Sequence, residues 1–248
     1  MLAGLRIART KHHLVVHDRK LVKLRALKKR YAIAIEADLE RAVADADLLV
    51  IAVRPNSVLG LLRALGKVNR PLLAVSLAAG VPMRILANAL GAPVRWARAM
   101  PSPVCRNGRG LTAVTFPRML PRSDRQRILD LFGSFGPVIE IAESNFDAFT
   151  VTYSCSHGYH ALTTLAEAAR DSGLDRKTAL LAAAHALADG IAAWREGNDS
   201  LESLLEEAAT PGGIAATTKT AMDAAGYRSA VRKGVAAGLR RARANARQ

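Results

Sequence analysis

The sequence predicts an α/β protein, in which a mostly parallel sheet with helices on both faces is followed by an all-helical region. Three observations predict this fold. Short apolar segments alternate with helical segments up to about residue 143, and an alanine-rich helical pattern without strands follows. In the alternating part, six consecutive apolar residues, Leu48 to Val53, form a run too short for a typical helix. That run predicts a strand buried on both faces.

The residues that follow this strand are candidates for a ligand site. In parallel sheets, ligands bind just beyond the carboxyl ends of the strands, and Arg54, Pro55 and Asn56 fall there. A proline also ends a strand without any ligand, because it cannot continue the ladder of hydrogen bonds. Taken alone, the Arg-Pro corner fits both interpretations.

Several short elements are expected before this strand. Met1 to Thr10 has helical character, but no capping residue and no strand precedes it. A strand is expected at Leu14 to His17. Asp38 is expected to cap a helix that leads into the central strand. The expected ranges are a helix over 21–31, a strand over 33–35 and a helix over 39–44.

The alternation continues beyond Asn56. Pro82 is suited to the first turn of a helix, and Pro117 to Ser123 has the composition of a loop. This order is typical of parallel sheets covered by helices. The expected elements are a helix over 58–65, a strand over 72–76, a helix from Pro82, a strand over 94–99, an extended segment over 108–116, a helix over 124–135 and a strand over 138–141.

The second part of the chain is predicted to be entirely helical. Ser144 or Asn145 can cap a long helix toward Arg170, and Asp175 can start another. A third helix is expected over 201–208, and the chain is helical again after residue 213. The change in character predicts two domains, with residues 1–143 in the first and residues 144–248 in the second.

Composition limits the function classes. Half of the residues are apolar and 23% are charged, which excludes a disordered chain. The net charge of +15 is concentrated at the two ends, with ten Lys or Arg against one acid in residues 1–30 and seven against none in residues 228–248. Nucleic acid binding through these ends predicts steep salt dependence, but aromatic residues for base stacking are scarce, at 4%.

The sequence also predicts where the protein resides. Cys105 and Cys155 lie far apart and form no C-x-x-C pair, which favours a reduced, cytoplasmic protein. Arg6, Arg9 and Lys11 interrupt the apolar core that a signal peptide requires. No segment offers about 18 uncharged apolar residues, so a membrane span is not expected.

Four motifs together resemble the pyrroline-5-carboxylate reductase family. They occur in the same order and spacing as that family's A-V-K-P-Q, S-I-A-A-G, R-V-M-P-N and S-P-G-G-T-T segments, and the resemblance covers essentially the whole chain. Asp147, Thr150 and Tyr159 also fall where its D-A-x-T and S-G-S-G-P-A-Y segments place them. The motifs are Ala52-Val53-Arg54-Pro55-Asn56, Ser76-Leu77-Ala78-Ala79-Gly80, Arg98-Ala99-Met100-Pro101 and Thr210-Pro211-Gly212-Gly213.

The resemblance implies a Rossmann domain followed by an all-helical domain that forms a homodimer or larger homo-oligomer. It also implies NAD(P)H-dependent reduction of a cyclic imine, 1-pyrroline-5-carboxylate, to L-proline in proline biosynthesis. The active site of this family lies between the cofactor domain and the helical dimer. No metal is required, and no membrane partner is implied. The alternative is a catalytically impaired paralogue that acts as a helical dimer in another interaction.

The first departure from the family is at the start of the sequence. The family opens with a strand and a glycine-rich turn, and Met1 aligns just after that turn. In the Rossmann strand order the absent strand is central, so its two neighbours would lie about 10 Å apart with unpaired backbone groups between them. The glycine-rich turn is also the pyrophosphate cradle. We therefore expect this sequence to be a truncated version of a longer chain.

Two further departures concern the reaction site. Tyr153 to Tyr159 carries larger residues than the family's glycine-rich segment, and His157 in it is a candidate proton donor to the imine nitrogen, although such a histidine is often only packed in a helix interface. A serine nucleophile at Ser156 lacks the glycine that its motif requires at position 154. Ile214 and Ala215 replace two threonines, while Thr210 keeps a hydroxyl. The adjoining Pro-Gly-Gly backbone suits either carboxylate binding or a plain helix corner.

The choice of cofactor has a local signal. Arg19 and Lys20 directly follow the second strand of the family fold, where the adenosine ribose is expected, and cations there favour the 2′-phosphate of NADP. Asp18 leaves NAD open as the alternative.

The resemblance implies three groups of site residues. The expected cofactor-binding residues are Arg19, Lys20, Ala52, Val53, Arg54, Pro55, Asn56, Ser76, Ala78, Ala79 and Gly80. The expected substrate-binding residues are Met100, Ser102, Thr210, Gly212 and Gly213, and the expected catalytic residues are Thr210 and His157. Catalysis would come mostly from positioning two reactants in a dry pocket.

Overall fold

The computed structural model describes residues 1–247 of the chain, which form two compact units. Unit 1 comprises Met1–Tyr153 together with the chain from Gly238 onward, and unit 2 comprises Ser154–Ala237. The chain thus leaves unit 1 after Tyr153 and returns to it near its C-terminus. Within residues 1–247, no helix combines the length and the apolar character needed to cross a membrane.

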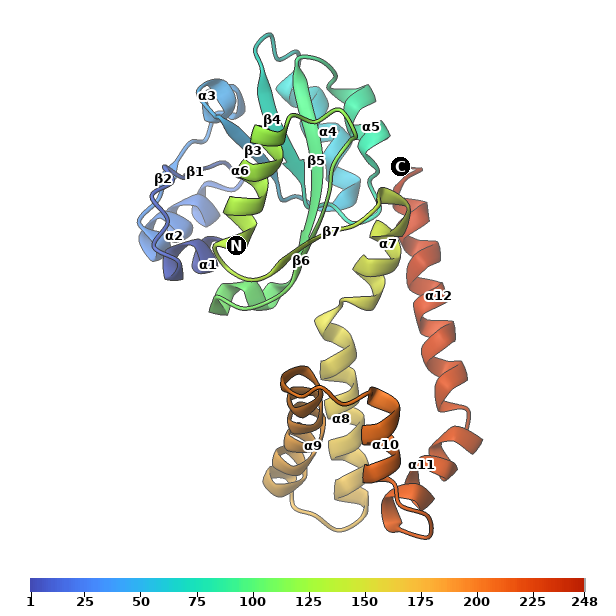
Figure 1. The fold of residues 1–248 in the computed structure, drawn as a ribbon. Helices are drawn as coiled ribbons and strands as arrows, with labels where there is room; N and C mark the ends of the chain where they lie inside the picture. Colours follow the sequence, from blue (N-terminus) through green and yellow to red (C-terminus); the bar gives the residue numbers. More distant parts are fainter. Residues whose placement is uncertain (248) are drawn as a thin grey trace. The chain divides into compact units, whose positions relative to one another are not determined.

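Unit 1 contains a mostly parallel sheet, which confirms the predicted fold class (Figure 1). Its five strands are β3 (Leu48–Ile51), β4 (Leu72–Ser76), β5 (Val94–Pro101), β6 (Thr112–Thr115) and β7 (Val138–Glu140), paired in that order. All pairs are parallel except β5 with β6. A separate parallel pair joins β1 (Val15–Val16) to β2 (Ala34–Ile35).

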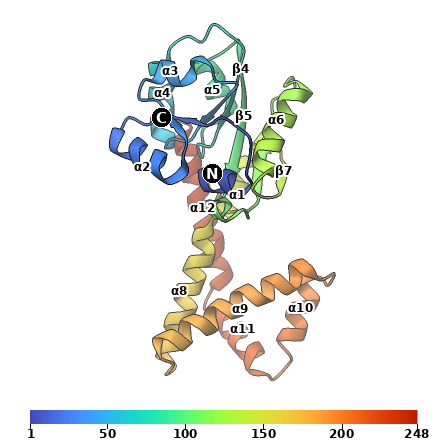
Figure 2. The ribbon, with the colours of Figure 1, turned by 90° about the vertical axis from the view of Figure 1, so that its left-hand side faces the viewer.

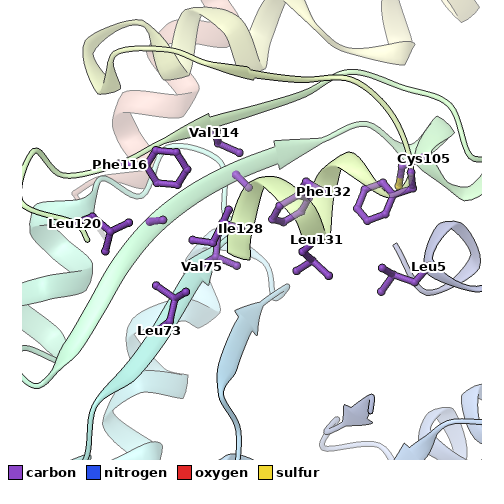
Figure 3. Packing of buried hydrophobic residues seen from close by; sticks show 13 residues of the cluster. Leu5, Leu73, Val75, Cys105, Val114, Phe116, Leu120, Ile128, Leu131 and Phe132 are labelled. Atoms are coloured by element: carbon purple, nitrogen blue, oxygen red, sulfur yellow. The ribbon is translucent and has the colours of Figure 1, made fainter. Parts of the chain in front are cut away.

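Helices cover both faces of the five-stranded sheet. Alternate side chains of a strand point to opposite faces, so Leu72 and Ala74 pack on one side and Leu73 and Val75 on the other. The first side is covered by α4 (Val58–Leu65) and α5 (Met83–Ala89), and the second by α6 (Arg122–Gly133) (Figure 2). Figure 3 shows the buried apolar residues on this second side, where Ile128, Leu131 and Phe132 of α6 lie over Leu73 and Val75.

The strand Leu48 to Val53 is less buried than the sequence predicts. It ends at Ile51, and Leu48, Leu49 and Val50 are only half-buried. The strand that is buried at every residue is β4. The reason is that β3 pairs only with β4 within residues 1–247, which makes it the edge of its sheet. No ladder joins β1 to β3 in the described chain, which is the break in the sheet that the sequence predicts.

The helices of the first part largely follow the expected ranges. The N-terminal helix α1 spans Leu2–Ile7, α2 spans Leu21–Tyr31 and α3 spans Leu39–Ala44. Asp38 caps α3 as predicted, since its side chain accepts a hydrogen bond from Arg41 N. Short 3₁₀ segments, η1 (Pro55–Ser57) and η2 (Pro103–Asn107), follow β3 and β5.

The predicted long helix from residue 144 to about Arg170 is wrong. The chain breaks at Tyr153 and Ser154, between α7 (Glu143–Thr152) and α8 (Cys155–Asp171). The Ser154 hydroxyl accepts a hydrogen bond from Ser156 N and so begins a new helix. Tyr153 Oη accepts a hydrogen bond from Leu111 N at 2.6 Å, which holds the end of α7 on unit 1.

Unit 2 consists of helices with little buried surface. Its helices are α8, α9 (Arg176–Glu196), α10 (Leu201–Ala208), α11 (Ile214–Ala224) and the first part of α12 (Tyr227–Asn245). In residues 154–237, all of which are described, the buried apolar side chains are Ala166, Ala179 and Ala183. Such small side chains bury too little apolar area to stabilise a unit of this size.

Large apolar side chains are instead exposed on unit 2. On α9 alone, Leu180 is 49% exposed, Leu181 57%, Ile191 57% and Trp194 45%. Monomeric proteins rarely expose so many large apolar residues on one element. This surface is therefore typical of a unit that is completed by another protein chain.

A buried arginine joins β5 to α7 within unit 1. Arg98 is 2% exposed, and its two terminal nitrogens lie 3.4 Å from Glu143 Oε1 and 3.4 Å from Asp147 Oδ1. Its guanidinium also lies 4.3 Å from the ring centroid of Phe146. Glu143 Oε1 accepts a second hydrogen bond from Met83 N at 2.6 Å. Arg98 thus links the sheet to the helix that leads out of unit 1.

We expect Arg98→Met to lower the free energy of unfolding of unit 1 by about 2–4 kcal/mol, because two partly buried carboxylates lose their counter-charge. The measurement is urea unfolding followed by circular dichroism. Lys28→Met is the control, since Lys28 is exposed on α2 of the same unit and its loss should cost less than about 1 kcal/mol. Equal losses in the two variants would contradict this account of Arg98.

Candidate functional site

The carboxyl ends of β3, β4 and β5 lie at one edge of the sheet. The three strands are parallel, with Ile51 paired to Ser76 and Ser76 paired to Arg98. Leu77 N donates a hydrogen bond to Ile51 O at 2.9 Å, so the segments after β3 and β4 are direct neighbours. The structure therefore brings together the two predicted cofactor segments, residues 52–56 and 76–80.

The segment after β3 presents its backbone and one cation to solvent. Ala52, Val53, Arg54 and Asn56 are exposed, and Pro55 is half-buried as the first residue of η1. Ser57 N donates a hydrogen bond to Arg54 O at 2.9 Å, which tightens the turn. This geometry leaves the Arg54 guanidinium available for an anionic group.

The segment after β4 folds back on itself. Ser76 is 1% exposed, and its hydroxyl accepts a hydrogen bond from Ala78 N at 3.2 Å. Gly80 has a φ of +74°, in the left-handed region that favours glycine. Ser76 and Ala78 are therefore buried supports of the turn, and a ligand at this edge would meet the half-buried residues Leu77 and Ala79.

This turn also contacts the C-terminal end of the chain, which no sequence pattern predicts. Asn245 Nδ2 donates a hydrogen bond to Ala79 O at 3.2 Å, and a Cβ atom added at Gly80 would lie 2.2 Å from Ala242 O. A pocket of about 180 Å³ lies where Pro55 approaches the chain at Asn245–Arg247. Asn245 and Ala79 are 166 positions apart in the sequence, so no local pattern predicts their hydrogen bond.

The carboxyl end of β1 carries the predicted cofactor-discriminating residues. The Asp18 carboxylate accepts a hydrogen bond from Lys20 N at 3.0 Å and forms an ion pair with Lys23. The Lys23 hydrogen bond is the main reason that the pKa of Asp18 is lowered, and partial burial opposes it. The side chains of Arg19 and Lys20 are exposed. Asp18 is thus engaged within the chain, whereas the two cations face solvent, which fits a phosphate better than a ribose hydroxyl.

The predicted substrate residues of unit 1 lie at the carboxyl end of β5, with Met100 in the strand and Ser102 directly after it. Met100 is half-buried within the strand, and Ser102 is 4% exposed. The Ser102 hydroxyl accepts a hydrogen bond from Val104 N at 3.4 Å and so caps η2. Both residues belong to the same edge of the sheet as the cofactor segments, because β5 runs parallel to β4.

The remaining predicted residues lie in unit 2. His157 is exposed in the first turn of α8, and Thr210 is exposed ahead of α11. Gly213 N donates a hydrogen bond to Thr210 O at 3.0 Å, and Gly212 has a φ of +78°. Gly213 is the N-cap of α11, and no side chain of the described residues caps this helix. Its first N–H groups are therefore available to an anion.

The described part of the chain shows no cluster suited to a metal. Across residues 1–247, no group of three or more His, Cys, Asp or Glu side chains lies close enough to hold an ion. What the geometry offers is cations and exposed backbone at the sheet edge of unit 1, and an uncapped helix N-terminus in unit 2. Such features bind phosphates and carboxylates.

Two family models match the chain. The model described as pyrroline-5-carboxylate reductase dimerisation matches residues 143–245. The model described as NADP oxidoreductase coenzyme F420-dependent matches residues 2–80. The first match spans the helical part of the chain, and the second spans the strands that lead to the candidate site.

Curated relatives are similar over most of the chain. Pyrroline-5-carboxylate reductase 3 of Bacillus subtilis is 33% identical over 196 residues, which are 77% of this chain and 71% of the relative. Pyrroline-5-carboxylate reductase of Mycobacterium leprae is 31% identical over 208 residues, which are 80% of this chain and 70% of the relative.

Solved structures share the fold. The 1-pyrroline-5-carboxylate reductase of Streptococcus pyogenes has a TM-score of 0.89 at 21% identity, covering 98% of this chain and 93% of that chain. The pyrroline carboxylate reductase of Plasmodium falciparum with NADP bound has a TM-score of 0.87 at 20% identity, covering 99% of this chain and 92% of that chain. Both confirm a parallel sheet domain followed by a helical one.

The engagement of Asp18 can be tested by titration. We expect Lys23→Met to raise the pKa of Asp18 toward the usual value, because the main stabilising hydrogen bond is lost. The stability contributed by Asp18 is present above its unfolded pKa of about 3.9 and is lost as the pH falls through the lower folded pKa. The measurement is the carboxyl carbon NMR shift of Asp18 against pH.

The control for this titration is Lys28→Met, which removes a charge from the exposed face of the same helix. Lys28 makes no side-chain hydrogen bond to Asp18, whose side-chain partner is Lys23. An Asp18 pKa that moves equally in both variants would contradict the specific pairing.

Proposed function

Because the chain belongs to the pyrroline-5-carboxylate reductase family, we propose that it reduces 1-pyrroline-5-carboxylate to L-proline with NADPH, a step of proline biosynthesis. The observation that carries this conclusion is the 33% identity to a curated reductase over 77% of the chain. The fold agrees over 98% of the chain with a solved reductase. The alternative of a catalytically impaired paralogue is not favoured by these relatives.

NADP is the cofactor that the chain fits. The family model over residues 2–80 is named for NADP, and Asp18 is already paired with Lys23. When bound, NADPH supplies the hydride. We assign Arg19 and Lys20 to the 2′-phosphate, and the exposed segments after β3 and β4 to the rest of the dinucleotide. Ser76 stabilises the turn after β4, because its hydroxyl accepts a hydrogen bond from Ala78 N.

The imine carboxylate is assigned to the N-terminus of α11. The uncapped N–H groups that follow Gly213 suit a carboxylate, and the left-handed Gly212 shapes the turn. Met100 and Ser102 are assigned to the substrate at the edge of the sheet. The Thr210 hydroxyl is assigned to orient the imine, and a ring nitrogen of His157 to donate the proton that the imine nitrogen gains. Substitution of the family threonines by Ile214 and Ala215 leaves the backbone as the main anion site.

The two parts of the chain have distinct roles in this proposal. Residues 1–143 hold the cofactor, and residues 144–248 form the helical domain of a homo-oligomer, most simply a dimer. The dimerisation family model covers residues 143–245, and unit 2 exposes large apolar side chains on α9. Neither Cys105 nor Cys155 forms a disulfide in the described chain, which supports the proposed cytoplasmic location. Nucleic acid binding by the basic ends stays outside this proposal.

The activity is tested directly with purified protein. We expect NADPH to be oxidised on addition of 1-pyrroline-5-carboxylate, with stoichiometric formation of proline measured by amino-acid analysis. The KM for NADPH should be about tenfold lower than that for NADH, because Arg19 and Lys20 are free to contact the 2′-phosphate. No NADPH oxidation at any imine concentration would contradict the proposal and favour the impaired paralogue.

The proposed homo-oligomer can be tested by a substitution on α9. Leu181→Glu places a charge on an apolar side chain that we assign to the interface, so the dissociation constant of the oligomer should rise about 100-fold. Size-exclusion chromatography with light scattering measures the mass. Met119→Glu is the control, because Met119 is 88% exposed in unit 1. An unchanged mass in Leu181→Glu at dilute concentration would remove α9 from the interface.

A further inference from the structure

We propose that Asn245 is a positioning residue for the cofactor, because it holds the turn Leu77–Gly80 in the conformation that receives the dinucleotide. The proposal rests on the function above, which places the cofactor at the carboxyl end of β4. It assigns a binding role to the C-terminal end of α12, which the sequence analysis did not include in any site.

The side chain of Asn245 contacts the backbone of the turn. Asn245 Nδ2 donates a hydrogen bond to Ala79 O at 3.2 Å. Ala79 is half-buried between Ala78 and Gly80, which are both buried. The turn is otherwise supported from within, by Ser76 Oγ accepting from Ala78 N. Leu77 and Ala79 are the half-buried residues of this turn, and Asn245 fixes the carbonyl of Ala79.

The backbone of α12 also lies directly against this turn. A Cβ atom at Gly80 would lie 2.2 Å from Ala242 O and 3.0 Å from Ala242 Cα. One turn earlier, a Cβ atom at Gly238 would lie 2.7 Å from Val151 Cγ1 of α7. Gly238, Ala242 and Asn245 are spaced by four and three residues, so they share one face of the helix. That face contacts α7 at Val151 and the turn at Ala79 and Gly80. Figure 1 shows the C-terminal part of α12 beside α7.

The end of α12 also approaches the other cofactor segment. The pocket of about 180 Å³ is lined by Pro55, Leu59, Val81, Ile85 and Asn245–Arg247. Its volume is too small for a dinucleotide, which needs a cleft of several hundred Å³. The pocket therefore shows that residues 245–247 lie near η1 and α4 as well as near the turn after β4.

Because the Asn245 hydrogen bond orders the turn before the cofactor binds, it should increase the affinity for the cofactor. A turn with a left-handed glycine samples other conformations when nothing holds it, and ordering it on binding costs free energy. One lost hydrogen bond corresponds to about a three- to tenfold weaker binding of the ligand that needs the ordered turn. Chemistry after binding should be unaffected, because Asn245 contacts the turn and not the imine site.

The test uses the full chain with Asn245→Ala and the isosteric Asn245→Asp, which cannot donate to Ala79 O. Asn88→Ala is the matched control, because Asn88 is exposed on α5 and the described residues give its side chain no hydrogen bond. NADPH fluorescence titration gives the Kd, and steady-state kinetics give kcat and both KM values. Hydrogen exchange of peptides covering residues 72–82 reports the turn without any cofactor.

We expect both Asn245 variants to raise the Kd and the KM for NADPH three- to tenfold and to speed exchange in residues 77–80. The kcat, the KM for the imine and the melting temperature should stay close to those of the Asn88→Ala control. Unchanged exchange and Kd would overturn the proposal, as would a loss of melting temperature without local exchange. If the unmodified chain binds no NADPH, the proposed function fails, while faster exchange in the variants would still support the contact.

Discussion

The parallel pairing of β3, β4 and β5 is the constraint on which the account of this chain depends. It brings three carboxyl ends to one edge, where Ile51, Ser76 and Arg98 lie in register. The segments after these strands then become neighbours, although the sequence separates them by about 20 residues. A dinucleotide needs such an edge, because it is held by backbone groups and cations from several strand ends.

Much of this framework was predictable from local patterns. The strand Leu72–Ser76 and the helix Val58–Leu65 have the predicted bounds, since apolar runs and helical spacing are local signals. The cap at Asp38 was also predictable, because its carboxylate bonds to a backbone group three residues away. The register of motifs along the chain then identified the family, which the comparisons confirm.

The errors and omissions have non-local causes. Burial of β3 depends on which strands pair with it, and a run of apolar residues cannot report its own neighbours. The helix break before Cys155 depends partly on Tyr153, whose hydroxyl is held by Leu111 N across 42 positions. The contact of Asn245 with Ala79 spans 166 positions. Each depends on tertiary contacts, whereas caps and strand ends depend on neighbouring residues.

The most direct test of the central claim is a crystal structure of this chain with NADPH. The account predicts that the dinucleotide lies across the carboxyl ends of β3 and β4, with a phosphate within hydrogen-bond distance of Arg19 or Lys20. It also predicts contacts with the backbone at Ala52–Arg54 and at Ala79. Density for the cofactor at the opposite edge of the sheet, or confined to unit 2, would contradict the account.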